Sequence, residues 1–358
     1  MRSRYRGDIS FVIPSWNHVD LLVSCIHSIQ KQDFIQDVHE NKRLFEIIIV
    51  DNGSEKNELA KLFEAFPEIV EVSKNEYSGD IPNYRINVFC LEQNTGFSAA
   101  VNRGIKAASG DILVLLNNDI ILDPAFVTHV MMYMDEYPNR LHAATKIRQF
   151  HHRELLDDVG NALLPTGRAV KIGYHEKDTG QYDKQDCVFS ACGAAAVYRK
   201  DFFDTVGYFD EDFFAYLEDV DLGFRAQRMG HCCGWIPEAV SYHIGSATTG
   251  SMKNTFTVRL LAKNQVGLFI KNMPVSLIVI LFLPVLFMMS AQFIKFGFQF
   301  NGNGKAFWQG FLEGLHQMNL WIEKRKTQKG LWSQSAWRLW IQLKKMSFLY
   351  YRSKRNRI

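Results

Sequence analysis

Several carboxylates stand at expected strand ends, which is where a cation or a nucleotide can be bound. Asp119 ends an expected strand within the segment 115–119, which reads Leu-Leu-Asn-Asn-Asp. A carboxylate is a hard oxygen ligand, which suits Mg²⁺ or Mn²⁺ shared with the phosphates of a ligand. The same residues also fit a turn or a helix N-cap before Pro124. Asp119 alone does not decide between a metal site and a turn.

Two further polar segments are candidates for nucleotide contacts. Asp51 follows the apolar run 47–50 directly, and its carboxylate can accept the N3–H of uracil or thymine, a donor that cytosine lacks. The alternative is a purely structural role, since Asp-Asn-Gly-Ser is a common turn sequence. The stretch from Gln93 to Phe97 sits at a strand-to-helix junction, where free backbone N–H groups and Gly96 let a diphosphate approach the helix start. A capped helix with a permissive glycine is the alternative there.

An acidic cluster and one histidine complete the candidates for chemistry. Glu218, Asp219 and Asp221 fall within four positions at an expected helix start. Acidic residues there stabilise the helix dipole by about 0.3 to 1 kcal/mol each. Crowding also raises the pKa of at least one carboxylate, as a general base requires. His243 follows an expected strand, and it becomes a candidate metal ligand only together with other ligands.

The elements that must position these residues alternate between strands and helices. This alternation is typical of βαβ units and predicts an α/β fold with a mostly parallel sheet flanked by helices. In such sheets ligands bind at the carboxyl ends of the strands. The sequence does not decide whether the region from Thr145 to Val188 forms a loop or a hairpin. The predicted strands are 9–13, 45–50, 87–91 and 112–116, and the predicted helices are 19–30 and 97–109.

Composition indicates a folded protein with an unusual C-terminal region. The 358 residues are 47% hydrophobic and 22% charged, which favours one large domain plus an appendage. The net charge is +3, yet from Lys324 onward there are eleven Lys or Arg and no Asp or Glu. Such a segment binds an anionic partner, either phospholipid or nucleic acid. The six cysteines lack CxxC spacing, which predicts reduced thiols in a cytosolic domain.

An uncharged segment favours membrane contact. Between Lys271 and Lys295 lie 23 residues without a charge, enough to cross a hydrocarbon layer of about 30 Å. A straight transmembrane span is disfavoured by Pro284 in its middle and by positive charge on both flanks. A re-entrant or interfacial segment and a buried core helix are therefore alternatives. Tryptophans interleaved with Lys and Arg follow, as in interfacial helices. We predict an α/β domain at 1–271, a hydrophobic transmembrane or re-entrant segment at 272–298 and basic, aromatic amphipathic helices at 299–358.

Together the motifs resemble the family 2 glycosyltransferases with a GT-A fold, most closely the rhamnosyltransferase-like branch of bacterial surface polysaccharide synthesis. The resemblance covers roughly residues 9–271. Each motif is weak alone, and their common order makes coincidence implausible. The motifs are 12–17, 50–54, 94–97 with Asn102 and Gly104, 115–119, 207–211, 218–222, and His243 with Gly245.

The resemblance implies roles for individual residues. Asp119 matches the last acid of a metal-binding DxD motif whose first acid is replaced by Asn117, and His243 matches a second metal ligand. Asp219 matches the catalytic base, with Glu218 beside it. Pro14 and Asp51 flank the base of the nucleotide. The resemblance further implies that the ribose, the diphosphate and the sugar are contacted by Asn17, Asn94, Gly96, Asn102, Asn117 and Gly193.

The activity implied is inverting transfer of a sugar, with rhamnose the first choice, and it requires Mg²⁺ or Mn²⁺. The donor is linked to dTDP or UDP, and the acceptor is a glycan on a polyprenyl carrier. The catalytic domain is expected on the cytoplasmic side of the inner membrane. The alternatives are another hexosyl- or galactofuranosyltransferase, a sugar-nucleotide pyrophosphorylase, a silent scaffold and a nucleic-acid-binding protein. A pyrophosphorylase is disfavoured because residues 14–17 lack glycine and lysine. A silent scaffold is disfavoured because Asp119, Asp219 and His243 are present. Nucleic-acid binding is disfavoured because the uncharged segment before the basic helices favours lipid.

Overall fold

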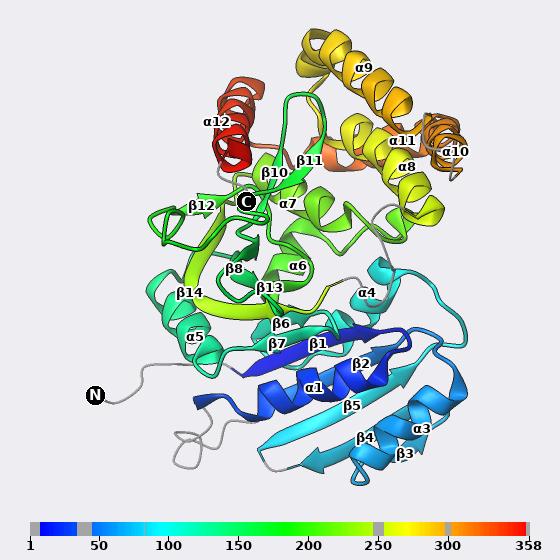
Figure 1. Ribbon diagram of the computed structural model, residues 1–358, viewed down its shortest axis with the longest axis vertical. Coiled ribbons are helices and arrows are strands. Elements are labelled where there is room, and N and C mark those ends of the chain that lie inside the picture. The colour runs from blue at the N-terminus through cyan, green and yellow to red at the C-terminus, as the bar shows by residue number, and fades with distance from the viewer. Residues whose placement is uncertain (1–7, 34–44, 82, 246–253, 298–301, 356–358) are drawn as a thin grey trace.

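A computed structural model describes residues 8–33, 45–81, 83–245, 254–297 and 302–355, and a large β-sheet runs through it (Figure 1). The sheet has the order β12-β14-β8-β13-β6-β1-β2-β5-β4-β3, with β7 beside β14 and β9 beside β8. Its centre is parallel, because β1 pairs with β2 and β6, and β2 pairs with β5. The bounds of these central strands are β1 Ile9–Ser15, β2 Phe45–Asp51, β5 Tyr84–Cys90 and β6 Ile112–Leu116.

The central strands are buried on both faces, which explains their continuous apolar sequences. Side chains alternate across a strand, so Phe11 and Ile13 join the core beneath α1 (Val19–Gln30), while Val12 joins the core beneath α4 (Phe97–Ala107). Helix α4 packs closely, since a Cβ at Gly104 would lie 2.5 Å from Cγ1 of Val12. The predicted α/β class with helices on both faces is confirmed.

The outer parts of the sheet are antiparallel, so the sheet is mixed and mostly parallel only at its centre. Strand β13 runs antiparallel to both β6 and β8, although β14 is parallel to β8. The remaining strands are β3 Val70–Ser73, β4 Glu76–Ile81, β7 Ile120–Leu122, β8 His142–Gln149, β9 Leu156–Asp158, β12 Cys187–Val188, β13 Ala195–Arg199 and β14 Cys233–His243.

The region that the sequence left open, 145–188, holds several very short strands. After β8 and β9 it forms a separate hairpin of β10 (Asn161–Leu163) and β11 (Ala169–Lys171). Strand β12 then pairs antiparallel with β14. A disulfide joins Cys187 to Cys232 beside that pair, so the expectation of six reduced thiols is wrong for these two residues.

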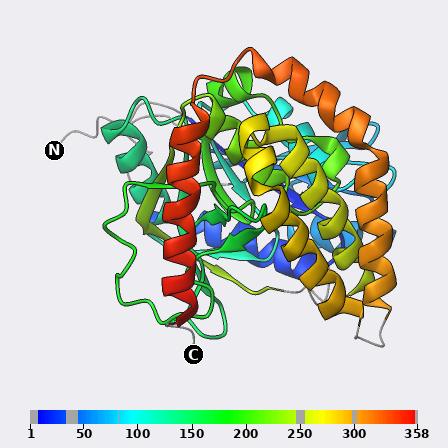
Figure 2. The same ribbon diagram turned by 90° about the horizontal axis from the view of Figure 1, so that it is seen from above.

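The other helices cover the sheet and one end of the molecule. Seen from above, α9 and α12 and the helices between them lie over the same end (Figure 2). Helix α8 lies beneath them and contacts both α7 and α10. The bounds are α3 Lys56–Ala65, α5 Phe126–Glu136, α6 Asp201–Val206, α7 Glu218–Arg228, α8 Thr255–Asn272, α9 Val275–Gly297, α10 Asn303–His316, α11 Met318–Lys329 and α12 Ala336–Arg355.

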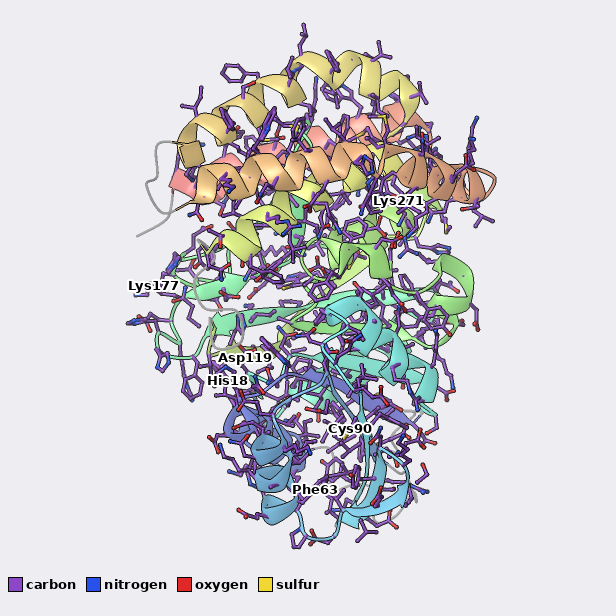
Figure 3. The ribbon with its side chains drawn as sticks, turned by 90° about the vertical axis from the view of Figure 1, so that its right-hand side faces the viewer. His18, Phe63, Cys90, Asp119, Lys177 and Lys271 are labelled. Atoms are coloured by element: carbon purple, nitrogen blue, oxygen red, sulfur yellow. A yellow bond between two sulfur atoms is a disulfide. The ribbon has the colours of Figure 1, made fainter. Side chains whose placement is uncertain are left out.

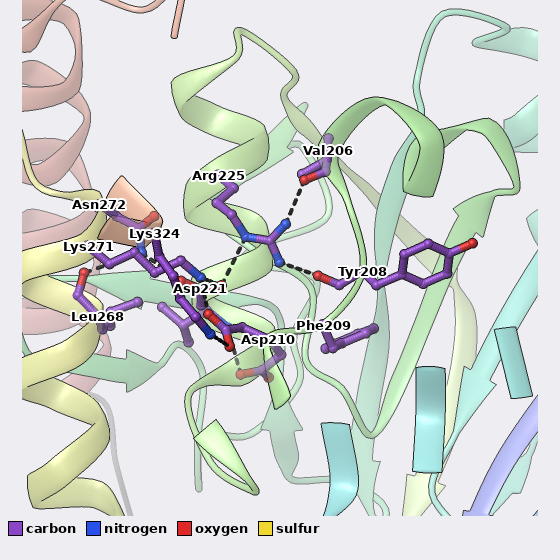
Figure 4. A network of polar contacts seen from close by, with 12 residues as sticks. Val206, Tyr208, Phe209, Asp210, Asp221, Arg225, Leu268, Lys271, Asn272 and Lys324 are labelled. Atoms are coloured by element: carbon purple, nitrogen blue, oxygen red, sulfur yellow. Dashed lines mark hydrogen bonds and ion pairs between the residues drawn. The ribbon is translucent and has the colours of Figure 1, made fainter. Parts of the chain in front are cut away.

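A buried ionic network joins α8 to α7 (Figure 4). The Lys271 ammonium lies 2.7 Å from Asp210 Oδ2 and 2.8 Å from Asp221 Oδ2. Asp221 also accepts hydrogen bonds from Arg225, at 2.9 Å, and from Asn272, at 2.7 Å. Lys271 is 1% exposed and Asp221 is fully buried. Because both charges are out of water, each depends on its partners.

Replacing Lys271 should be costly for the folded state. In Lys271→Met the stem is kept, but Asp210 and Asp221 lose their shared cation, and the free energy of unfolding should fall by about 3 kcal/mol. Chemical denaturation followed by circular dichroism measures this. Lys326→Met is the matched control, because its ion pair with Glu323 is exposed on both sides and should contribute less than about 1 kcal/mol. Equal losses in both variants would contradict the role given to Lys271.

Candidate active site

The carboxyl ends of β1, β2 and β6 bring the predicted polar segments to one edge of the sheet. Ser15 and Asp51 are register partners at the ends of β1 and β2. The backbone N–H of Asn52 donates to Ser15 O at 2.8 Å. Asn118, which follows β6, donates through Nδ2 to Ser15 Oγ at 3.2 Å. Segments separated by about a hundred residues therefore share one edge, as expected for a ligand site in such a sheet.

Asp51 and Asn17 form one side of this edge. The Asp51 carboxylate is buried and accepts a hydrogen bond from Ser54 N at 3.2 Å. Burial raises its pKa, and hydrogen bonds from Ser54 and Gly53 oppose the rise. Asn17 has a left-handed backbone, φ 55°, and its N–H donates to Ser54 Oγ at 2.7 Å. These bonds fix the loop after β2 against the end of β1, in which Pro14 is buried.

The segment before α4 is shaped by its own hydrogen bonds. Asn94 Oδ1 accepts from Asn52 Nδ2 at 3.1 Å and from Gly96 N at 2.9 Å. Gly96 has φ 89°, and a Cβ there would come within 2.6 Å of Phe214. This glycine is therefore required for backbone conformation and for contact with the loop before α7.

Asn102 has a structural task. Its Nδ2 donates to Phe209 O at 2.9 Å and to Glu211 Oε1 at 2.8 Å, and its Oδ1 accepts from Phe209 N at 3.0 Å. The side chain is 2% exposed. The amide of Asn102 is therefore occupied by the acidic segment before α7.

Asp119 and His243, the two predicted metal ligands, are in contact. Asp119 Oδ2 lies 3.3 Å from His243 Nε2. Strand β7, which follows Asp119, pairs with the end of β14, where Ile120 is the register partner of His243. Asp119 is 4% exposed, and its Oδ1 is buried without a hydrogen-bond partner. Figure 3 shows Asp119 near the ends of the central strands and Lys271 beneath the C-terminal helices.

Two residues that the sequence did not single out, Asp157 and Lys171, organise His243. Asp157 Oδ2 lies 3.0 Å from His243 Nδ1 and 2.7 Å from Lys171 Nζ. A carboxylate on Nδ1 fixes the ring and turns Nε2 toward Asp119, which is the arrangement usual for metal-binding histidines. Burial lowers the pKa of His243, but Asp119 and Asp157 outweigh burial and raise it to about 9. Asp158, the next residue, is fully buried.

Asp219 and Glu218 occupy the first turn of α7 with different exposure. Glu218 is buried, and burial together with Asp219 raises its pKa well above the ordinary value. Asp219 is partly exposed, and its Oδ2 accepts from Gly193 N and Asn161 Nδ2, both at 3.0 Å. Burial raises the pKa of Asp219 against the opposing effect of these bonds. A partly exposed carboxylate with a raised pKa has the properties of a general base.

Two connections tie Asp219 to the Asp119 and His243 pair. Gly193 precedes Ala194, whose carbonyl accepts from Asn117 N at 2.9 Å at the end of β6. Asn161 begins β10, shortly after Asp157, which binds His243. The three side chains expected to act together therefore come from one region, with Asp119 and His243 in contact and Asp219 linked through Gly193 and Asn161.

The loop before α7 is strained and is held by α8. Phe214, Tyr216 and Leu217 have φ of 63°, 69° and 68°, a region that costs about 1 kcal/mol or more for residues with a side chain. Asn264 of α8 is fully buried, and its Nδ2 lies 2.8 to 2.9 Å from the carbonyls of Phe213, Ala215 and Tyr216. Helix α8 thus stabilises the conformation that presents Asp219.

The residues at Asp119 fit a divalent cation shared with a diphosphate. Among the residues that the structure describes, no group of three or more His, Cys, Asp or Glu is arranged to hold a metal. Mg²⁺ sites commonly use one or two carboxylates and take their other ligands from phosphate and water. The buried, unpartnered Oδ1 of Asp119 supplies a carboxylate oxygen of that kind. His243 Nε2, 3.3 Å from Asp119 Oδ2, places a nitrogen donor beside it.

Asp158 makes stability depend on pH. Burial raises its pKa from 3.8 to about 7, so folding favours the protonated form, and this contribution is lost as the pH rises through about 7. Asp158→Asn keeps the acceptor for Gly160 N without the charge. Without metal, the variant should gain about 2 kcal/mol over the wild type between pH 5 and pH 8 in denaturant titrations. The exposed control Asp80→Asn should show no such gain, and a flat difference for Asp158→Asn would refute the assignment.

Known proteins share this sequence pattern. The model of glycosyl transferase family 2 matches residues 10–207, and that of glycosyl transferase family group 2 matches residues 173–301. YwdF, a glycosyltransferase of Bacillus subtilis, is 26% identical over 220 residues, covering 62% of this chain and 68% of YwdF. The N-acetylglucosaminyl-diphospho-decaprenol L-rhamnosyltransferase of Mycobacterium tuberculosis is 40% identical over 58 residues, 16% of this chain and 19% of that enzyme.

A solved structure is also similar. The mannosyltransferase PcManGT from Pyrobaculum calidifontis, in complex with GDP-Man and Mn²⁺, aligns with a TM-score of 0.49 at 15% identity, over 97% of this chain and 87% of that one. The mixed sheet with flanking helices is the GT-A-like architecture that the resemblance implied. Since the family model matches more than half of the 358 residues, the chain belongs to glycosyl transferase family 2.

Proposed function

We propose that this glycosyltransferase inverts the sugar's configuration and uses a divalent cation, with Asp219 as the base and Asp119 and His243 as the protein ligands of the cation. The observation that carries the proposal is the contact between Asp119 and His243 at the carboxyl edge of β6, with Asp219 held beside the same edge. A bound cation supplies Lewis-acid stabilisation of the departing diphosphate. The protein residues orient the donor and remove the acceptor proton.

Exposure selects Asp219 among the carboxylates of the region. Asp119, Asp157, Asp158 and Glu218 are all buried, at 7% exposure or less. Asp219 is partly exposed, and an acceptor hydroxyl can reach it. A retaining mechanism needs a second accessible carboxylate as nucleophile, whereas Asp157 is engaged by Lys171 and His243. These features favour a single displacement, in which Asp219 takes the proton of the attacking hydroxyl.

The donor is proposed to carry uracil or thymine, because Asp51 stands buried at the end of β2 where a carboxylate can accept N3–H. Rhamnose is the first candidate sugar, supported by the similarity of a short segment to the mycobacterial L-rhamnosyltransferase. That enzyme's name gives N-acetylglucosaminyl-diphospho-decaprenol as its acceptor. A lipid-linked glycan in cell-surface polysaccharide synthesis is the acceptor proposed here. We place the enzyme at the inner membrane with its catalytic residues on the cytoplasmic side.

A panel of nucleotide sugars tests the donor assignment. Release of nucleoside diphosphate is measured for dTDP-rhamnose, UDP-galactofuranose, UDP-glucose, UDP-N-acetylglucosamine and GDP-mannose, each with Mg²⁺, Mn²⁺ or excess chelator. The proposal predicts turnover only with a dTDP or UDP donor and only with metal. Preferred use of GDP-mannose, or full activity in chelator, contradicts it.

Asp219→Asn tests the base. The amide keeps the hydrogen-bonding shape but cannot take a proton, so turnover should fall by about 10³-fold or more, while nucleotide binding in calorimetry stays within about twofold. The control is Asp204→Asn, an exposed carboxylate of α6, which should retain activity. Wild-type turnover in Asp219→Asn removes this residue from the base role.

Asp119→Ala tests the metal site. Donor affinity in the presence of Mn²⁺ should fall by about tenfold or more, because the phosphates lose their shared cation, and added Mn²⁺ should restore it only in part. In excess chelator the variant and the wild type should bind the nucleotide equally. A loss of affinity of the same size in chelator would show that Asp119 acts without a metal.

A further inference from the structure

The helices that follow α9 return to the domain that precedes it. In α11, Arg325 Nη1 donates to Ile270 O at 2.8 Å and to Met273 O at 2.6 Å, and Lys324 pairs with Asp210. In α12, Ser353 Oγ accepts from Gly173 N at 3.2 Å. The chain on both sides of α9 therefore belongs to one packed body.

This return of the chain decides how α9 can meet a membrane. Among the described residues, α9 is the one helix long and apolar enough to cross. Its candidate span, Val275–Phe296, has 22 residues and a mean hydropathy of 2.5. A single crossing would place α10, α11 and α12 on the side opposite the catalytic domain. Their buried contacts with that domain exclude this arrangement. A helix of this composition that does not cross is suited to lie along the membrane surface.

Helix α9 has one face on the protein and the rest outward. Leu277 and Leu281 are 5% and 2% exposed and belong to the main core, together with Leu339 and Leu343 of α12. The outward residues are large and apolar, and Val279, Leu283 and Phe287 are 72%, 71% and 77% exposed. Soluble proteins rarely expose such a stripe without a partner.

Helix α12 supplies the charge that identifies this partner. Its inner residues, such as Leu339 and Leu343, are buried, while Trp337, Ile341, Phe348 and Tyr351 are exposed by 51% to 67%. The helix contains Arg338, Lys344, Lys345, Arg352, Lys354 and Arg355 and no acidic residue. Helix α10 adds the exposed Trp308 and Leu312. Aromatic and apolar residues beside a cationic helix are complementary to the headgroups and acyl boundary of anionic phospholipid.

We propose that the outward faces of α9, α10 and α12 form a docking surface for one leaflet of an anionic bilayer, with α9 lying in the membrane plane and not crossing it. Figures 1 and 2 show these helices as a layer at one end of the molecule. The inference refines the membrane placement proposed above, but it rests on the contacts of α8 to α12 and does not depend on the identity of the sugar. The protein would therefore associate with the membrane as a monotopic protein, and the surface would bind phospholipid.

Vesicle binding by the full chain tests the surface. Co-flotation is measured with phosphatidylglycerol–phosphatidylcholine vesicles and with pure phosphatidylcholine vesicles. The wild type should bind the anionic vesicles more strongly, and Leu283→Glu with Phe287→Glu should lower partitioning by about tenfold or more. Val70→Glu with Val72→Glu is the matched control, because it adds the same two charges at exposed apolar sites on β3, at the far end of the molecule. Equal binding by the double variant and the control would overturn the proposal, as would self-association without vesicle binding.

A second measurement distinguishes an α9 that lies in the membrane plane from an α9 that crosses the membrane. Green fluorescent protein or alkaline phosphatase is fused to the C-terminus of the full chain in a bacterial host. The first reporter should fluoresce and the second should stay inactive, since the C-terminus remains on the side of the catalytic domain. Active phosphatase would show that α9 crosses. Nucleoside diphosphate release in detergent should match the wild type in the Leu283 and Phe287 variant, so failure of docking and failure of the proposed chemistry remain distinguishable.

Discussion

The site depends on a buried ion pair that lies outside it. Lys271 of α8 sits between Asp210 and Asp221, and both carboxylates flank the segment that leads into α7. Neither the ammonium nor the carboxylates can be left alone out of water. Their pairing therefore fixes where α8 meets α7, and with it the start of α7, where Asp219 projects. The neighbouring Asn264 then holds the left-handed loop before that helix.

The site also requires acidic and basic side chains to alternate along the sheet edge. Lys171, Asp157, His243 and Asp119 follow one another within hydrogen-bond or ion-pair distance. Each carboxylate is thus stabilised by a cationic or N–H neighbour, although all lie close to one another. One oxygen, Asp119 Oδ1, has no partner at the end of this series. That oxygen is the place where a cation brought in with a diphosphate would complete the pattern.

The sequence predicted the parts that follow from strand ends. Asp51 and Asp119 were found because long apolar runs define β2 and β6, and parallel neighbours place their ends together. Asp157, Asp158, Asn161 and Lys171 were missed, because β9, β10 and β11 are three residues each and carry no periodic signal. The pair Asp157-Asp158 before Val159-Gly160 was the available clue.

Other roles were beyond sequence reasoning because they depend on contacts between distant segments. Asn102 fits a donor-binding motif, yet its amide is occupied by Phe209 and Glu211. Lys271 marked only the edge of an uncharged segment in the sequence, and burial against α7 makes it central. The inference that α9 does not cross the membrane likewise depends on Arg325 and Ser353, which anchor the later helices to the catalytic domain.

Asp119 and His243 are proposed to share one cation with the nucleotide. Pulsed electron paramagnetic resonance of Mn²⁺ bound together with UDP or dTDP tests this directly, because a coordinated imidazole gives a nitrogen coupling and the nucleotide gives a phosphorus coupling. Both couplings are expected in the wild type, and only the nitrogen coupling should be lost in His243→Gln. Mn²⁺ that shows phosphorus coupling but no nitrogen coupling in the wild type would contradict it.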